Sequence, residues 1–291
     1  MDGNGDLLAG TDNGLYVYHN DTTPLQHIIH DSRNIQSLTN NIIWNIFADQ
    51  EHNIWLGTDY GISLSRYNSA LQFIPISQIT GTGDGNQFYS LFRDSKGFYW
   101  FGGTNGLIRF TDPAGERHDT IWYRMGDKTY PLSHNRIRHI YEDKEQQLWI
   151  ATDGSINRYD YATRQFIHYN IVDSTGMYNT NWTYYMFEDT AGQLWISTCL
   201  GGIFVVDKHK LMQSASGQYV AEQNYSVHNG LSGMFINQII PDNEGNVWVL
   251  LYNNKGIDKI NPRTREVTKL FADELSGEKS PNYLSLIHIS E

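Results

Sequence analysis

The chain has 291 residues, 13% of them aromatic, and a formal net charge of −11 with a pI of about 5.4. Only 21 Lys and Arg stand against 32 Asp and Glu, so the clustered positive charge that phosphate contacts need is missing and nucleic-acid binding is not expected. No apolar run reaches the length of a membrane-spanning helix, so none is predicted. The single cysteine, Cys199, excludes an intramolecular disulfide and is interpreted as a small packing residue rather than a catalytic thiol.

One phrase recurs along the whole chain. Its clearest copy runs from Asp94 to Leu107, and the other copies begin at Asp2, Asp49, Asp143, Asp189 and Asp242. The sixth residue after the Asp is a tryptophan in five copies, namely Trp55, Trp100, Trp149, Trp195 and Trp248, and is Leu8 in the first. Successive tryptophans lie between 45 and 53 residues apart. A period of this size is typical of repeat arrays and propellers, and the recurrent tryptophans are expected to pack between neighbouring repeats.

Each repeat predicts four short strands. In the second repeat an apolar run over 42–48 leads into the Asp turn, and runs over 54–58, 62–67 and 71–76 follow between further turn residues. Four-stranded sheets repeated in this way are the blades of a β-propeller. We therefore predict an all-β fold with about six four-stranded blades over residues 1–283, cut from a larger propeller array.

The two ends of the chain depart from the pattern. The first repeat begins at once with Asp2, so its blade is expected to lack its first strand. Residues 284–291 match one translation of a common sequencing adapter and are interpreted as an adapter-derived tail, with an ordinary final strand as the alternative. By its alternating pattern the segment 283–289 is predicted to fill the missing strand beside Leu7–Thr11, because an open sheet edge invites pairing.

The repeated phrase resembles the two-component regulator propeller repeat, found in the periplasmic sensor region of hybrid two-component systems of Bacteroidetes. The copies at Asp143 and Asp242 depart from it, the first by losing the turn glycine and the second by losing the Gly-Thr after the tryptophan. The resemblance implies a sensor input without catalytic activity or cofactor. It further implies a parent with a second propeller, an immunoglobulin-like domain, an inner-membrane anchor, a histidine kinase and a DNA-binding output that controls polysaccharide-utilisation genes. The implied partners are an oligosaccharide or other small ligand, those neighbouring domains and a possible homodimer.

Comparison of the repeats with one another indicates a ligand site. Counted back from the turn Asp, the eighth residue is Asn in most copies and the third is always apolar, whereas the seventh and fifth differ from copy to copy. A requirement of the fold would make these positions alike, so their variation favours position-specific chemistry at the mouth of the central channel. Aromatic side chains there suit the faces of sugar rings, and Arg or Asn suits hydroxyl, carboxylate or sulfate groups. The predicted contacts are Trp44, Tyr89, Arg136, Arg138, Trp182, Tyr184 and Asn237, with packing between blades as the alternative reading.

The other motifs give weaker indications of function. Asp2-Gly-Asn4-Gly-Asp6 resembles the start of an EF-hand loop, but Asn13 stands where the bidentate Glu belongs, so no calcium site is expected. The pairs His27 with His30 and His134 with His139 lack a third ligand and are interpreted as surface or packing residues. A propeller lyase or hydrolase remains an alternative, although no acid/base set can be named, and a docking scaffold is the third possibility.

Overall fold

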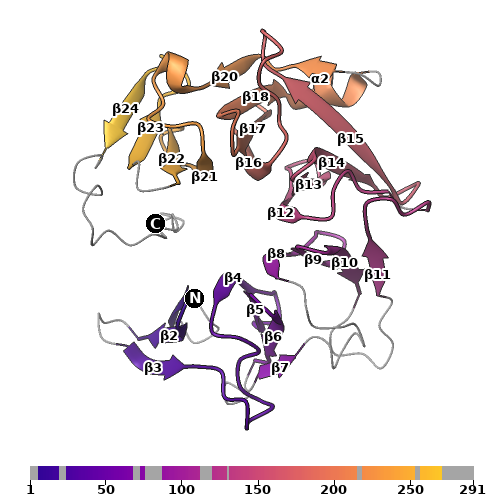
Figure 1. Ribbon diagram of the computed structural model, residues 1–291, viewed down its shortest axis with the longest axis vertical. Helices are drawn as coiled ribbons and strands as arrows, with labels where there is room; N and C mark the ends of the chain where they lie inside the picture. The colour runs from indigo at the N-terminus through magenta and orange to yellow at the C-terminus, as the bar shows by residue number, and fades with distance from the viewer. Residues whose placement is uncertain are drawn as a thin grey trace. The chain divides into compact units, whose positions relative to one another are not determined.

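The computed structural model describes residues 6–19, 24–67, 73–75, 87–111, 120–129, 131–214, 218–252 and 256–270. Its strands form six small sheets in which the strands follow one another in chain order (Figure 1). Sheet 1 contains β1 (Leu7–Thr11), β2 (Gly14–Tyr18) and β3 (Pro24–Ile28); sheet 2 contains β4 (Ile43–Ala48), β5 (Ile54–Thr58), β6 (Gly61–Ser65) and β7 (Phe73–Pro75); sheet 3 contains β8 (Phe88–Arg93), β9 (Tyr99–Gly103), β10 (Gly106–Phe110) and β11 (Ile121–Tyr123).

The second half of the chain supplies the remaining sheets. Sheet 4 contains β12 (Ile137–Glu142), β13 (Leu148–Thr152), β14 (Ser155–Asp160), β15 (Gln165–Val172) and β19 (Gln218–Val220); sheet 5 contains β16 (Thr183–Glu188), β17 (Gln193–Thr198), β18 (Ile203–Asp207) and β20 (Gln223–Tyr225); sheet 6 contains β21 (Ile236–Pro241), β22 (Val247–Leu251), β23 (Ile257–Ile260) and β24 (Val267–Leu270). Among the residues that the structure describes, the helical segments are α2 (Lys208–Gln213) and the 3-10 turn η1 (Val227–Asn229). No helix within the described ranges is both long and apolar enough to cross a bilayer.

This all-β architecture confirms the predicted propeller fold, and the strand boundaries of the second repeat agree with prediction to within three residues. Sheet 1 shows three strands among the described residues, as expected from the missing first strand. The predicted tail and the predicted pairing of 283–289 lie outside the described residues. So does the turn at Asp2.

The repeated Asp organises its turn and its tryptophan at once. In the third repeat one carboxylate oxygen of Asp94 accepts hydrogen bonds from the backbone N–H groups of Lys96 at 3.0 Å and Phe98 at 2.8 Å. The other oxygen accepts the indole N–H of Trp100 at 2.7 Å. The same indole bond joins Trp55 to Asp49, Trp149 to Asp143, Trp195 to Asp189 and Trp248 to Asp242, at 2.8 to 3.0 Å. The constant spacing of six residues therefore reflects a hydrogen bond that the sequence pattern had not revealed.

The turn keeps its shape even where glycine is absent. The third residue after the Asp adopts a positive φ whether it is Gly97 at 87°, His52 at 62° or Gln146 at 60°. The loss of glycine in the fourth repeat therefore leaves the left-handed conformation in place, at the steric cost that a side chain carries there.

Contacts within the chain define two compact units, one formed by residues 1–129 and 135–140 and the other by 130–134 and 141–291. In unit 1, β4 packs against both β1 and β8. Trp55 of sheet 2 lies in a buried cluster with Phe88, Tyr99 and Phe101 of sheet 3, which confirms its predicted role between blades. Gly57 permits this approach, because a Cβ on it would lie 2.6 Å from the carbonyl oxygen of Phe88.

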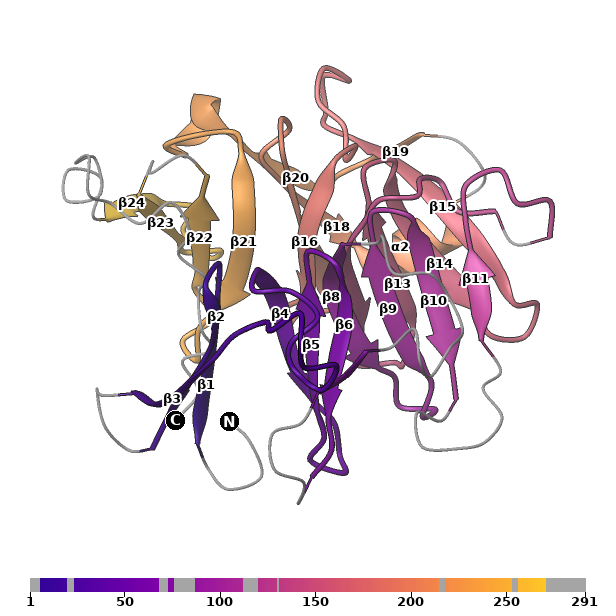
Figure 2. The same cartoon turned by 60° about the horizontal axis from the view of Figure 1, so that its bottom comes forward.

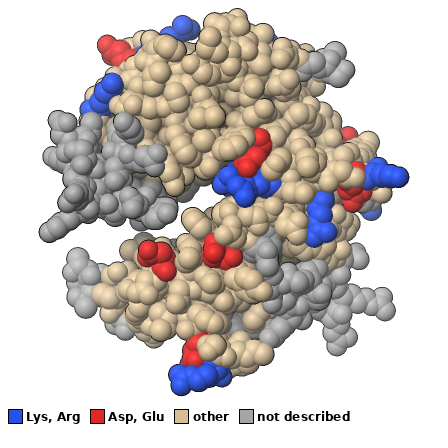
Figure 3. All heavy atoms as spheres, viewed as in Figure 1, with Lys and Arg blue, Asp and Glu red and all other residues tan. Residues whose placement is uncertain are grey.

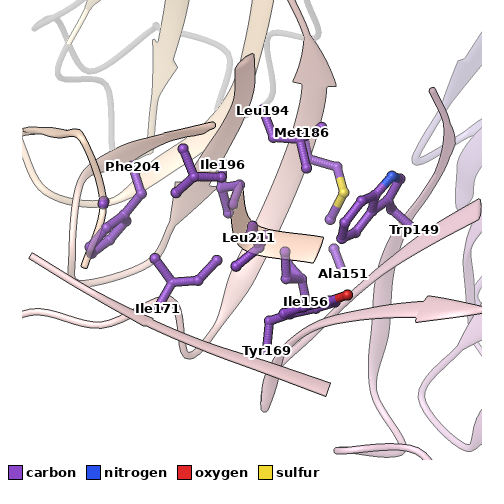
Figure 4. Close-up of a cluster of buried hydrophobic side chains, with 12 residues drawn as sticks. Trp149, Ala151, Ile156, Tyr169, Ile171, Met186, Leu194, Ile196, Phe204 and Leu211 are labelled. Carbon is purple, nitrogen blue, oxygen red and sulfur yellow. The ribbon is translucent and has the colours of Figure 1, made fainter. Parts of the chain in front are cut away.

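In unit 2, β16 lies beside β21, and sheets 4 and 5 share a core (Figures 2 and 4). In that core Trp149 of sheet 4 lies beside Met186 of sheet 5, and Ile171 of sheet 4 lies beside Phe204 of sheet 5. Trp195 similarly joins sheet 5 to the residues of sheet 6.

Four of the five recurrent tryptophans are fully buried, as expected for side chains that pack between repeats. Trp55, Trp100, Trp149 and Trp195 are at most 1% exposed. Trp248 is less deeply buried than the other four and lies beneath the Lys259 ammonium, 5.2 Å from its ring centroid.

The longest repeat spacing, between Trp195 and Trp248, contains an insertion that the sequence did not predict. Helix α2 follows β18, and β19 then pairs in parallel with β15 at the edge of sheet 4. The fully buried ammonium of Lys208 lies 3.2 Å from Asp143 and 3.1 Å from Glu188. These ion pairs raise the pKa of Lys208 although desolvation alone would lower it. The insertion thus ties the Asp turn of sheet 4 to the first strand of sheet 5.

Candidate functional site

The first strands carry a recurrent β-bulge at the predicted ligand positions. In sheet 2, Ile43 pairs with Thr58 and Asn45 pairs with Gly57, so Trp44 between them has no partner in the register. The same slip leaves Tyr89, Tyr184 and Asn237 between paired residues in sheets 3, 5 and 6. Bulges re-aim side chains and are frequent next to functional sites. One of the two variable positions of the repeat, the fifth residue before the Asp, is therefore also irregular in its strand pairing.

In unit 1 the structure brings three of the predicted residues together. The rings of Trp44 and Tyr89 meet edge to face with centroids 5.5 Å apart. The guanidinium of Arg138 lies 5.5 Å from the centroid of the Tyr89 ring. Trp44 is 42% exposed although it is a large aromatic residue on a strand. These side chains from β4, β8 and β12 form a partly exposed aromatic and cationic cluster.

Two polar residues complete this cluster, and neither was among the predicted contacts. The indole N–H of Trp44 donates to a carboxylate oxygen of Asp59 at 3.1 Å, and the side-chain amide of Gln87 donates to the same oxygen. The Tyr89 hydroxyl in turn donates to the Gln87 side-chain oxygen at 2.6 Å. Asp59 lies in the turn after β5, and its backbone N–H bonds to Ile42 at 3.0 Å. In sheet 3 the equivalent bond runs from the Thr104 N–H to the Gln87 carbonyl. In both sheets the turn between the second and third strands therefore lies beside a variable position.

Hydrogen bonds within the cluster hold its side chains together. Its hydrogen bonds fix the rings of Trp44 and Tyr89 relative to one another, while part of the indole stays accessible. A fixed aromatic surface flanked by a carboxylate, an amide and a guanidinium can stack on an apolar ring face and exchange hydrogen bonds with hydroxyl groups. Arg136, immediately before β12, is exposed in the same unit.

Unit 2 holds the other predicted residues in a more aromatic setting. The rings of Tyr184 and Phe235 meet edge to face at 5.4 Å, and Phe235 stacks on Tyr252 at 4.4 Å. Phe235 and Tyr252 were not predicted as contacts, although Phe235 occupies one of the variable positions. Asn237 is partly buried on β21.

Trp182 has an unusual backbone conformation. Its φ is +56°, and its side chain is 49% exposed. Its N–H donates to Asp153 and its carbonyl accepts from Cys199, both at 3.0 Å. A positive φ is rare for a bulky residue, and such outliers gather at functional positions. These two backbone hydrogen bonds stabilise the strained conformation of Trp182, in which about half of the side chain is exposed.

The histidines and the cysteine that the sequence singled out lie outside these clusters. His27 stacks on Tyr16 with centroids 4.1 Å apart, and His30 contacts the Leu38 carbonyl. Both histidines are exposed, which agrees with their interpretation as surface or packing residues. Burial lowers the pKa of His139 to about 3, so this imidazole is neutral at physiological pH. Cys199 is 4% exposed, as expected for a packing residue. Over the described ranges no three His, Cys, Asp or Glu side chains come together as a metal site.

Comparison with known proteins identifies the repeats. The family model described as two component regulator propeller matches residues 37–60, 82–105 and 131–154. Two crystal structures of the extracellular domain of BT4673 from Bacteroides thetaiotaomicron, described in one case as a one component system and in the other as a hybrid two component system, are 94% and 95% identical to the chain, with TM-scores of 0.70 and 0.71. Each match covers 99% of this chain but only 39% of the BT4673 domain.

More distant structures share the fold alone. The extracellular domain of BT3049 from the same organism is 22% identical over 93% of this chain and 33% of its own, with a TM-score of 0.70. Virginiamycin B lyase from Staphylococcus aureus is 14% identical over 78% of this chain and 69% of its own, with a TM-score of 0.55. No curated protein matches the sequence. The propeller repeats and the near-identical neighbours place the chain in the two component regulator propeller family, as it occurs in the extracellular domains of hybrid two-component systems of Bacteroides.

Proposed function

We propose that this chain is part of the ligand-sensing input of a hybrid two-component system and that it binds a glycan fragment through the cluster around Trp44. The parent protein would lie in the periplasm, anchored in the inner membrane, and would control genes for polysaccharide use. The near identity to extracellular domains of such systems supports the sensing role. The observation that carries the ligand site is the bulge at the variable position of the first strands, together with the fixed Trp44–Tyr89 pair.

Within the cluster each residue has a role. Trp44 offers its accessible face to a pyranose ring, and Tyr89 supports it edge-on. Asp59, Gln87 and Arg138 supply acceptors and donors for sugar hydroxyls. Arg136 of the same unit is a further candidate contact, and Trp182, Tyr184 and Asn237 are candidate contacts on unit 2 taken by itself. Binding acts on the kinase only insofar as the ligand prefers one conformational state of the sensor, because a ligand shifts an equilibrium through differential affinity alone.

The test is a calorimetric titration of the complete extracellular domain with a panel of neutral and acidic oligosaccharides. Trp44→Ala should weaken binding of the responding glycan at least about tenfold, which corresponds to about 1.4 kcal/mol. Tyr67→Ala is the matched control, because Tyr67 is 43% exposed but lies after β6 and outside the cluster. Equal affinities of the Trp44→Ala variant and the parent for the glycan would show that the cluster does not bind it.

The enzymatic alternative has less support. The virginiamycin B lyases are 10% to 14% identical to the chain and share only its fold. Prolonged incubation of the domain with the glycan that it binds, followed by chromatography, tests for turnover, and release of cleaved or rearranged product would establish a catalyst.

A further inference from the structure

Three connecting segments of unit 2 meet at one end of sheets 4, 5 and 6. We call residues 174–182, 199–202 and 226–235 the loop surface. The Cys199 N–H bonds to the Trp182 carbonyl, which joins the first segment to the second. Asn224, just before the third segment, donates to the Gly201 carbonyl at 2.8 Å. The Tyr178 hydroxyl lies 3.4 Å from His228, which joins the first segment to the third.

The loop surface exposes large apolar side chains and has no charge. Met177 is 72% exposed, Leu200 68% and Val227 45%, and Trp182 lies among them. The three segments contain no Asp, Glu, Lys or Arg, although 18% of the chain is charged. The corresponding connections of unit 1 do carry charges, for example Asp31 and Arg33 between β3 and β4. Figure 3 shows few charged side chains on the part of the viewed face that lies over sheet 5.

These apolar side chains project from an ordered backbone. An oxygen of Asp173 accepts the Tyr178 N–H at 2.8 Å and so closes the loop that carries Met177. A capping box of Ser226 and Asn229 fixes the short helical turn that carries Val227. Such a surface loses little conformational entropy when a partner covers it, because the backbone is already fixed.

We propose that the loop surface is the docking surface for a further domain of the same extracellular polypeptide, which contacts it with an uncharged apolar patch. Depletion of charge with enrichment of aromatic residues and Met is the composition of the buried centre of protein interfaces. The chain spans 39% of the BT4673 domain that it matches at 94% identity, so most of that polypeptide lies outside this chain. Covalent linkage gives such a domain a high effective concentration, so a modest apolar contact is enough to keep it docked. The absence of charge disfavours an anionic membrane or a charged macromolecule as the occupant.

Methionine oxidation tests the proposal without any mutation. The complete extracellular domain is treated with dilute hydrogen peroxide, and sulfoxide formation is followed by mass spectrometry at Met177 and at the matched control Met125 of unit 1, which is 52% exposed. A docked domain should make Met177 oxidise several-fold more slowly than Met125. Faster oxidation of Met177, as expected from its greater exposure in this chain, would overturn the proposal. Protection that appears only at high protein concentration would instead identify a second copy as the occupant, and protection that appears only with glycan would identify a ligand; either result also overturns it.

A charge placed in the surface provides the second test. Leu200→Lys in the complete domain should restore rapid oxidation of Met177, because burial of an unpaired ammonium is unfavourable. Ile35→Lys is the control, since Ile35 is 73% exposed in a charged connection of unit 1 and should leave Met177 protected. Continued protection of Met177 in the Leu200→Lys variant would exclude this surface as the docking site. Trp182 is left unchanged because it is also a candidate ligand contact. Glycan affinity, which depends on the Trp44 cluster, reports on the proposed function separately.

Discussion

At the scale of single residues, the Asp-to-Trp hydrogen bond explains why this spacing is repeated. One carboxylate closes the turn with one oxygen and holds the buried indole with the other. An indole N–H buried without a partner would be costly. The pair therefore allows a large aromatic side chain to fill the space between two sheets while keeping its polar atom satisfied.

Substitutions at Trp149 separate packing from hydrogen bonding. Trp149→Ala should lower the free energy of unfolding by about 3–5 kcal/mol, as large aromatic truncations do. Trp149→Phe keeps much of the ring but removes the donor to Asp143, so a smaller loss of about 1–3 kcal/mol is expected. Chemical denaturation measures both, with Trp248→Ala as a control that should cost less because Trp248 is partly exposed. An unchanged stability of Trp149→Ala would count against the packing role.

At the scale of elements, glycines in the second strands set how closely the sheets of unit 1 approach. A Cβ on Gly102 would lie 2.4 Å from an Ile137 methyl carbon, and one on Gly57 would lie 2.6 Å from the Phe88 carbonyl oxygen. The first strand of the next sheet thus passes directly over the glycine. In unit 2 the equivalent positions hold Ala151, Ser197 and Leu250, so this device is specific to unit 1.

Gly57→Val should destabilise the domain by about 1–3 kcal/mol, because the nearest atom is a backbone carbonyl that cannot move aside as a side chain could. Thermal unfolding of the extracellular domain measures the effect. Gly97→Asn is a suitable control: no atom lies within 4 Å of the added Cβ, and Asn tolerates the positive φ of this turn. If Gly57→Val melted at the temperature of the parent, the close packing of β5 against β8 would be refuted.

At the scale of the whole molecule, buried clusters shared between sheets should make mutations within one unit interact. The clusters of Trp149 and Trp195 both pack against Tyr141 in unit 2. The cluster of Trp55 lies in unit 1 and has no residue in common with that of Trp195. Neighbouring sites couple and independent sites add.

Double substitutions to Phe test this difference, since Phe variants should remain folded. Trp149→Phe with Trp195→Phe should deviate from additivity by more than about 0.5 kcal/mol, whereas Trp55→Phe with Trp195→Phe should add within about that margin. Free energies of unfolding from denaturant titrations give the double-mutant cycles. The shared-cluster account fails if both pairs are equally additive.

Much of this protein could be read from its repeats. The turn Asp, the strands around it and the propeller fold follow from local patterns, because turns and alternating strands are encoded within a few residues. The second repeat shows this in detail, since β5 at Ile54–Thr58 lies where the pattern predicts it. The variable positions also singled out Trp44 and Tyr89, which the structure joins.

Contacts between residues distant in the sequence were decided by the tertiary structure alone. Asp59 meets Gln87 across 28 residues, and Lys208 reaches Asp143 and Glu188 from an inserted helix. The bulges depend on the register of a neighbouring strand, which the sequence of one strand does not specify. By itself the sequence determined the repeat, the blade and the variable positions. Only packing decided which side chains meet, because the partners of a buried polar group are chosen by the folded geometry and not by its neighbours in the chain.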